Sequence, residues 1–78
     1  MNKARRKAIA TIHDELGSLL DDAQMALDAE QEAYDNMPTS QQDGDRGEKM
    51  QEAIGELEQA ISSIESAQEA LNNAIGDA

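Results

Sequence analysis

The chain is 78 residues long and carries 17 acidic side chains against six Lys and Arg, a formal net charge of −11. A chain of this length forms one small domain with little core of its own. Because it contains no cysteine, a disulfide framework, a thiolate metal site and a catalytic thiol are all excluded. No apolar run approaches the roughly 20 residues of a membrane span, and no apolar segment follows the N-terminal charges, so we expect a soluble, cytoplasmic protein.

The charges are unevenly distributed along the sequence. Residues 8–78 hold all 17 acids and only two bases, a net charge of −15. A field of this sign attracts basic protein surfaces and disfavours docking on nucleic acid or anionic lipid. Acidic side chains also solubilise a helical protein, and the composition does not separate that role from a functional acidic face.

Residues 3–36 are predicted to form one long helix, because they are rich in Ala, Leu, Glu and Gln and contain no proline. The apolar stripe starts at heptad spacing and drifts around the helix, as 3.6-residue geometry predicts. The interior glycine, Gly17, indicates either a close helix contact or a weak point. The large apolar residues of the stripe are Ile9, Ile12, Leu16, Leu19, Leu20, Leu27 and Tyr34.

A basic cluster occupies the first turns of this helix, where positive charge opposes the helix dipole. Two explanations remain open. In an antiparallel hairpin the cluster lies beside Asp77 and the C-terminal carboxylate of Ala78, which neutralise it. Alternatively, the cluster is an anion-binding site, which becomes more effective when oligomer symmetry brings several copies together. The cluster consists of Lys3 and the candidate anion-binding residues Arg5, Arg6 and Lys7.

Catalytic and metal-binding patterns are absent from the sequence. The single histidine, His13, lies at the edge of the apolar stripe and has no second histidine, cysteine or nucleophile to pair with, which favours a packing or solvent-edge role. A calcium loop starting at Asp43 fails, because Glu48 and Ile54 occupy the positions that require glycine and glutamate. With no phosphate loop, His-Glu-x-x-His or serine elbow, we expect no enzymatic activity, cofactor or metal site.

Residues 37–45 are predicted to form a turn. Pro38 disfavours helical geometry in the residue before it and removes a backbone donor. We expect Asp43 or Asp45 to cap the second helix, with Glu48 completing an acidic capping box. The two long helices therefore fold back on each other as an antiparallel hairpin.

Residues 46–76 are predicted to form the second helix, with large residues alternating at heptad positions a and d and one polar exception, Gln68. Alanines repeat at position g and widen the apolar surface to about three positions in seven, so the helix needs more than one neighbour. The g row is Ala53, Ala60, Ala67 and Ala74, and the expected oligomer core is Ile54, Leu57, Ile61, Ile64, Leu71 and Ile75.

Residues 1–78 are thus predicted to be a single all-α domain, a long coiled-coil-like αα-hairpin. Its unpartnered apolar surface predicts a homo-oligomer. A dimer that forms a four-helix bundle is favoured over higher cyclic assemblies.

The predicted hairpin tip contains the only aromatic residue of the chain. It offers a candidate partner-binding surface, because an aromatic ring beside proline and arginine is a common anchor. Alternatively, the tyrosine and methionine close the end of the hairpin core, and the asparagine satisfies turn backbone groups. The candidate residues are Tyr34, Asn36, Met37, Pro38 and Arg46.

The tip sequence also resembles a known group of proteins. The run Tyr-Asp-Asn-Met-Pro at residues 34–38, with Arg46-Gly47-Glu48 and the following heptads, is similar to short uncharacterised acidic proteins encoded by bacterial phages and prophages. The resemblance covers roughly residues 30–65. Those proteins commonly have serine and leucine in the loop, where this chain has Gln-Gln-Asp-Gly-Asp at residues 41–45. The resemblance implies a phage setting inside a bacterial host cell and no defined activity.

Together these features favour a non-enzymatic interaction protein, a phage-encoded inhibitor or adaptor whose acidic surface occupies a basic surface of a host protein and imitates nucleic-acid charge. An alternative is an oligomer that sequesters a small anionic or nucleotide ligand through the basic cluster or through Arg46 and Lys49. A structural role in phage assembly is a third. The first predicts salt-sensitive binding to a basic protein, and the second predicts thermal stabilisation by a small anion.

Overall fold

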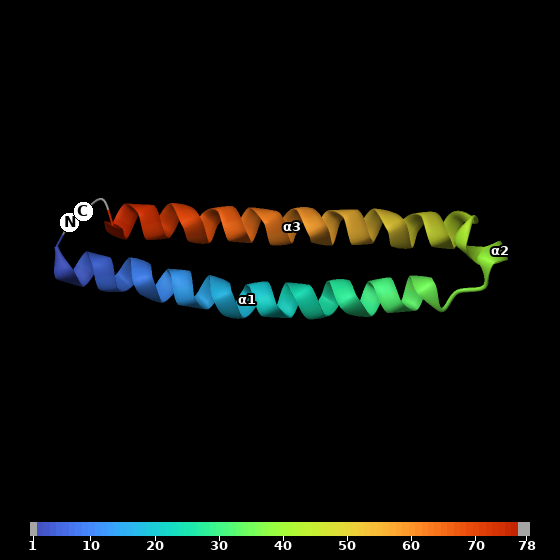
Figure 1. Cartoon of the computed structure of the whole chain (residues 1–78), viewed down its shortest axis with the longest axis horizontal. Coiled ribbons are helices and arrows are strands. Elements are labelled where there is room, and N and C mark those ends of the chain that lie inside the picture. The colour runs from blue at the N-terminus through green and yellow to red at the C-terminus, as the bar shows by residue number, and fades with distance from the viewer. Residues whose placement is uncertain (1, 77–78) are drawn as a thin grey trace.

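The computed structural model describes residues 2–76 and consists of two long helices that run side by side and are joined at one end (Figure 1). Helix α1 spans Lys3–Asp35 and helix α3 spans Asp45–Gly76, while the short helix α2, Thr39–Gln42, lies in the connection. The long helices pack antiparallel into a rod of 58 × 15 × 12 Å. No strand occurs within residues 2–76, and the prediction of an all-α antiparallel hairpin is confirmed. Among the helices of this segment, none combines the length and the apolar composition that a membrane crossing requires.

The helix ends follow local sequence signals. Helix α1 is capped by Asn2, whose side chain accepts a hydrogen bond of 2.8 Å from the Arg5 amide and so satisfies one of the free N–H groups of the first turn. At the other end the Asn36 N–H donates to the Glu32 carbonyl, and Pro38 prevents further helix.

The start of α3 differs from the predicted cap. The Glu48 amide donates to the Gly44 carbonyl at 3.0 Å, so Gly44 occupies the N-cap position and Asp45 is already inside the first turn. Asp43 instead follows the last residue of α2. The Asp45 carboxylate therefore stabilises α3 through the positive end of the helix dipole, and its predicted capping role is wrong.

The face of α1 that packs against α3 repeats every seven residues without the predicted drift. Two large side chains assigned to the stripe, Ile12 and Leu19, are 47% and 54% exposed. The seam stays straight because two helices that supercoil are slightly underwound to 3.5 residues per turn. The part-buried seam positions of α1 are Ile9, His13, Leu16, Leu20, Ala23, Leu27, Glu30 and Tyr34.

The a and d residues of α3 face α1, as the heptad pattern predicts. Ile54 and Ile61, 8% and 7% exposed, are the only buried hydrophobic residues within residues 2–76. The remaining large seam residues, including Leu57, Ile64 and Leu71, are part-buried. One hairpin alone therefore shields its apolar side chains incompletely, because each helix has a single neighbour.

Two cross-helix pairs define the register of the hairpin. A Cβ added at Gly17 would lie 3.5 Å from Gln68 Nε2, and Gln51 Nε2 donates to the Tyr34 hydroxyl at 2.6 Å. Gly17 and Tyr34 are separated by the same number of residues as Gln51 and Gln68, so the register is constant over about five helical turns. The 3.5 Å distance is ordinary van der Waals contact, so no close approach of α3 requires glycine at this position.

Candidate functional site

Tyr34 closes the core of the hairpin next to the tip. Its ring is part-buried, its hydroxyl accepts a hydrogen bond from Gln51 of α3, and its carbonyl accepts one of 2.9 Å from Gln42 Nε2 of α2. The residue thereby connects all three helices. This arrangement favours the structural interpretation of Tyr34 over the partner-binding one.

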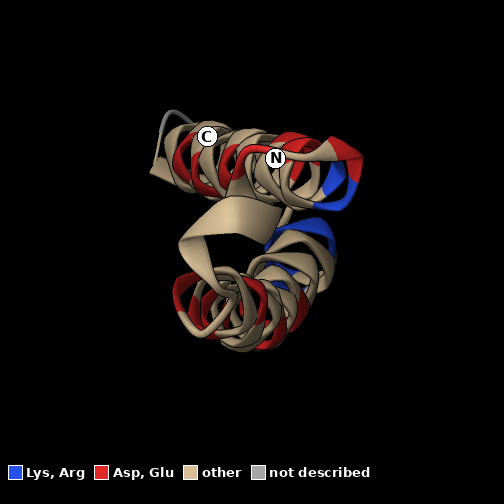
Figure 2. Ribbon diagram, turned by 90° about the vertical axis from the view of Figure 1, so that its right-hand side faces the viewer, with Lys and Arg blue, Asp and Glu red and all other residues tan. Residues whose placement is uncertain are grey.

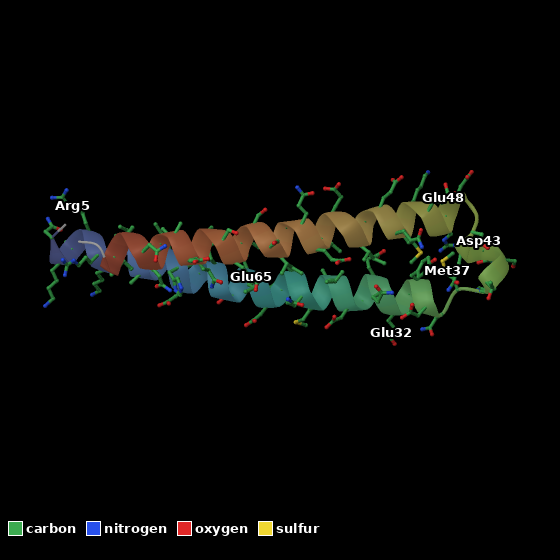
Figure 3. The ribbon with its side chains drawn as sticks, turned by 45° about the horizontal axis from the view of Figure 1, so that its top comes forward. Arg5, Glu32, Met37, Asp43, Glu48 and Glu65 are labelled. Atoms are coloured by element: carbon green, nitrogen blue, oxygen red, sulfur yellow. The ribbon has the colours of Figure 1, made fainter. Side chains whose placement is uncertain are left out.

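The other candidate partner-binding residues divide between the interior and the surface. Met37 is part-buried and lies between the ends of α1 and α3 (Figure 3). Asn36, Pro38 and Arg46 are exposed. The Pro38 carbonyl also accepts hydrogen bonds from the Gln41 and Gln42 amides and so starts α2. A partner that approached the tip would therefore meet Asn36, Pro38 and Arg46 rather than an aromatic anchor.

A buried glycine fixes the shape of the tip. Gly47 is buried, and a Cβ at this position would overlap the Gln42 carbonyl group and lie 2.7 Å from its Cα. The backbone of α2 can pack on the first turn of α3 only because this side chain is absent. A glycine in the first turn of a helix, beside a tight connection, is the sequence signal of such an approach.

The basic cluster lies at the end of the rod opposite the tip, where Figure 3 places Arg5. Arg5, Arg6 and Lys7 are exposed and point about 100° apart from one to the next around α1, so a single chain does not converge them on one ligand. Their predicted neighbours, Asp77 and Ala78, lie outside the described residues. In Figure 2 the basic segments are confined to small regions, while acidic segments spread around the outside of both helices.

His13 lies in the seam rather than at the edge of the stripe. Its side chain is 28% exposed, and its Nδ1 atom lies 3.4 Å from the Asp14 carboxylate. The structure therefore gives this residue a packing position between the helices. The sequence did not indicate a seam position for His13, because the neighbouring residue Ile12 is more apolar and was assigned to the stripe.

Six of the exposed acids form rows on one side of the hairpin. In an antiparallel pair the e positions of both helices border one side of the seam, with the b positions beyond them. Aspartates repeat every seven residues along the b row of α1, and glutamates occupy two e positions of α3 on the same side. We refer to this set as the acidic flank: Asp14, Asp21, Asp28, Asp35, Glu58 and Glu65.

The opposite side of the seam is apolar except at the first g position of each long helix, which Arg5 and Arg46 occupy. Here the g rows of both helices lie side by side, and two of the three exposed large hydrophobic residues of α1, Ile12 and Leu19, belong to this set. We refer to it as the apolar flank. Its α1 members are Ile12, Leu19, Ala26 and Ala33. Its α3 members are Ala53, Ala60, Ala67 and Ala74.

Sequence reasoning identified the alanine row but not the two flanks. To identify the flanks one must know which face of α1 packs against α3. Only this face places Ile12 and Leu19 beside the alanines of α3. The sequence signal for the acidic flank is the seven-residue spacing of the aspartates. The net charge of the chain does not reveal this spacing.

Neither a pocket nor a group of three metal-ligating side chains occurs within residues 2–76. No family model, curated protein or solved structure matches the chain. A functional interpretation therefore depends on the two flanks and on the two ends of the rod.

Proposed function

We propose that the protein is a non-enzymatic interaction protein that acts as a homodimeric four-helix bundle and presents its acidic flank to a basic surface of another protein. Taken with the resemblance of its tip to phage and prophage proteins, this makes it an inhibitor or adaptor that binds a host protein in the bacterial cytoplasm. The observation that carries the proposal is the segregation of an apolar and an acidic flank on opposite sides of one hairpin.

The apolar flank supports the dimer. A single hairpin buries only Ile54 and Ile61 among its described hydrophobic residues and leaves Ile12 and Leu19 about half exposed. A second hairpin on this flank removes those side chains from water, and the alanines of α3 allow the helices to approach closely. The acidic flank, on the far side of the seam, stays in solvent in this arrangement.

The acidic flank supports a basic partner. Its four aspartates follow one another at intervals of about 10.5 Å along α1, and the two glutamates of α3 run beside them. Such a line of charge accelerates encounter with lysine- and arginine-rich surfaces and repels nucleic acid. A nucleic-acid-binding host protein therefore meets a charge pattern of the same sign as its usual ligand.

The test compares two variants that lose the same number of charges. In the flank variant, Asp21→Asn, Asp28→Asn and Glu58→Gln remove three carboxylates from the acidic flank. In the control, Glu32→Gln, Asp43→Asn and Glu52→Gln remove three exposed carboxylates from elsewhere. Both are used as bait in lysate of a bacterial host, at about 0.1 M salt and at a salt concentration that screens exposed charges.

We expect the unaltered protein and the control to retain a defined basic protein at low salt and to release it at high salt. We expect the flank variant to lose at least about 90% of that protein, which corresponds to roughly 1.4 kcal/mol. Equal losses in the two variants would show that only net charge matters, and would contradict a role for the acidic flank.

A second candidate follows from the basic cluster, whose four cationic side chains lie at a helix end that disfavours positive charge. In this alternative a dimer sequesters a small anionic or nucleotide ligand between two copies of Arg5, Arg6 and Lys7. It predicts that nucleotides raise the melting temperature, and that replacing all three residues by glutamine abolishes the increase. Unchanged melting of the original protein would contradict it.

A further inference from the structure

Charged residues lie along both edges of the apolar flank. Their positions distinguish the possible arrangements of two paired hairpins. The c positions lie next to the g rows on the outer edge of each helix. On α1 these include two acids, Glu15 and Asp22, and on α3 they include Lys49 and Glu56. All four side chains are exposed, so any second copy on the flank must face them.

The register of the hairpin places each charged c residue of one helix level with an uncharged c residue of the other. The Gly17–Gln68 and Tyr34–Gln51 pairs define these levels. By this register the level pairs are Glu15 with Ala70, Asp22 with Ser63, Glu56 with Ala29 and Lys49 with Asn36.

Two symmetric arrangements bring apolar flanks face to face. If the two-fold axis runs along the rod, α1 of each copy lies over α3 of the other, and the levels within one hairpin are also the levels between copies. Each charged c residue then meets a small or uncharged one. If the axis runs across the rod, α1 lies against α1 of the other copy, and registers that keep the rods overlapped bring Asp22 near Asp22 or Glu15. Like charges at such positions oppose association.

The apolar residues favour the same arrangement. Ile12 is nearly level with Ala74, and Leu19 with Ala67. With the axis along the rod, each large side chain of one copy therefore lies over a small one of the other, which fills space evenly. With the axis across the rod, alanines of α3 meet alanines and leave that half of the interface underpacked.

We propose that a second copy of the chain covers the apolar flank and is related to the first by a two-fold axis along the rod, so that both tips lie at the same end. The inference rests on the dimer of the proposed function and specifies its geometry. It also places the two basic clusters at the same end of the bundle, opposite the tips.

Spin labels on single cysteines test this orientation, because the chain has no cysteine of its own. Ser40→Cys places a label on α2 at the tip, and Lys3→Cys places one at the other end of the rod; both positions are exposed. Neighbouring helices in a bundle are about 10 Å apart. Each labelled variant alone should therefore give a distance between copies below about 30 Å by pulsed electron paramagnetic resonance. An equimolar mixture of the two should add distances near the 58 Å length of the rod.

The other outcomes overturn the inference in distinguishable ways. A long distance in both single variants, with a dimer mass, would place the axis across the rod and leave the proposed dimer intact. A short distance for Ser40→Cys but none for Lys3→Cys would indicate contact between tips instead of flanks. Absence of coupling together with a monomer mass would overturn both the orientation and the dimer.

Discussion

At the scale of single residues, the structure of the tip depends on residues whose roles cannot be inferred from their residue type alone. Gly47 matters because it has no Cβ, and Gln42 and Gln51 matter because their amides reach Tyr34 from two different helices. These contacts hold the connection in place although it contains no long apolar residue other than Met37. The sequence indicates a turn through Pro38, but the neighbours of Gly47 depend on how α2 folds back, which no local pattern contains.

Gly47→Ala should destabilise the protein by about 1–3 kcal/mol, because the added methyl group overlaps the Gln42 backbone and forces α2 away from α3. The matched control is Gly55→Ala in the same helix, where a Cβ meets nothing within 4 Å. That change should stabilise by up to about 1 kcal/mol through helix propensity. Thermal unfolding followed by circular dichroism measures both. Equal shifts in the two variants would show that α2 does not pack on Gly47 in solution.

At the scale of the helices, the two seams were unequally predictable. The seam of α3 follows directly from its isoleucines and leucines, since only Gln68 interrupts them. The seam of α1 includes His13 and Glu30, which no apolar pattern selects, while Leu19 was assigned to it and is 54% exposed. The regular heptad of α3 determines which face of α1 is buried, because α1 must lie along the straight apolar row of α3 for either helix to bury its apolar side chains.

Ile61→Asp tests the face assigned to α3. Ile61 is 7% exposed, and a carboxylate there lacks a partner within the seam, so we expect a loss of several kcal/mol and a largely unfolded chain. The control, Gln59→Asp, places the same side chain on an exposed position of the same helix and should cost less than about 1 kcal/mol. Helicity and melting temperature distinguish the two variants. An unchanged melting temperature for Ile61→Asp would show that the seam lies elsewhere.

At the scale of the whole molecule, the rod is too thin to shield its own apolar residues. A hairpin of two helices has no third layer, and its narrowest extents are 15 and 12 Å. Small domains supplement a limited core with disulfides, metals or oligomerisation, and this chain has no cysteine. The charge of the chain is compatible with that association because the acids are concentrated away from the apolar flank, with Glu15, Asp22 and Glu56 at its border.

Leu19 and Met25 provide the most direct test of this assembly, because both are large, exposed hydrophobic residues of α1 in the single hairpin, at 54% and 69%. Leu19 belongs to the apolar flank, whereas Met25 lies on the outer face. If the hairpin were monomeric, glutamate would be tolerated equally well at either position. If a second copy covers the flank, Leu19→Glu forfeits about 1–2 kcal/mol of burial in each copy and places two carboxylates inside the bundle.

We therefore expect light scattering to return a dimer mass for the unaltered protein at micromolar concentration and for Met25→Glu. Leu19→Glu should give a monomer mass at the same concentration, with lower helicity because the separated hairpin exposes its apolar flank and is less stable. Circular dichroism at increasing concentration should recover part of that helicity by mass action, since folding and association are coupled. A dimer mass for Leu19→Glu equal to that of Met25→Glu would show that the copies meet on a different face, and the apolar flank would then not be the interface.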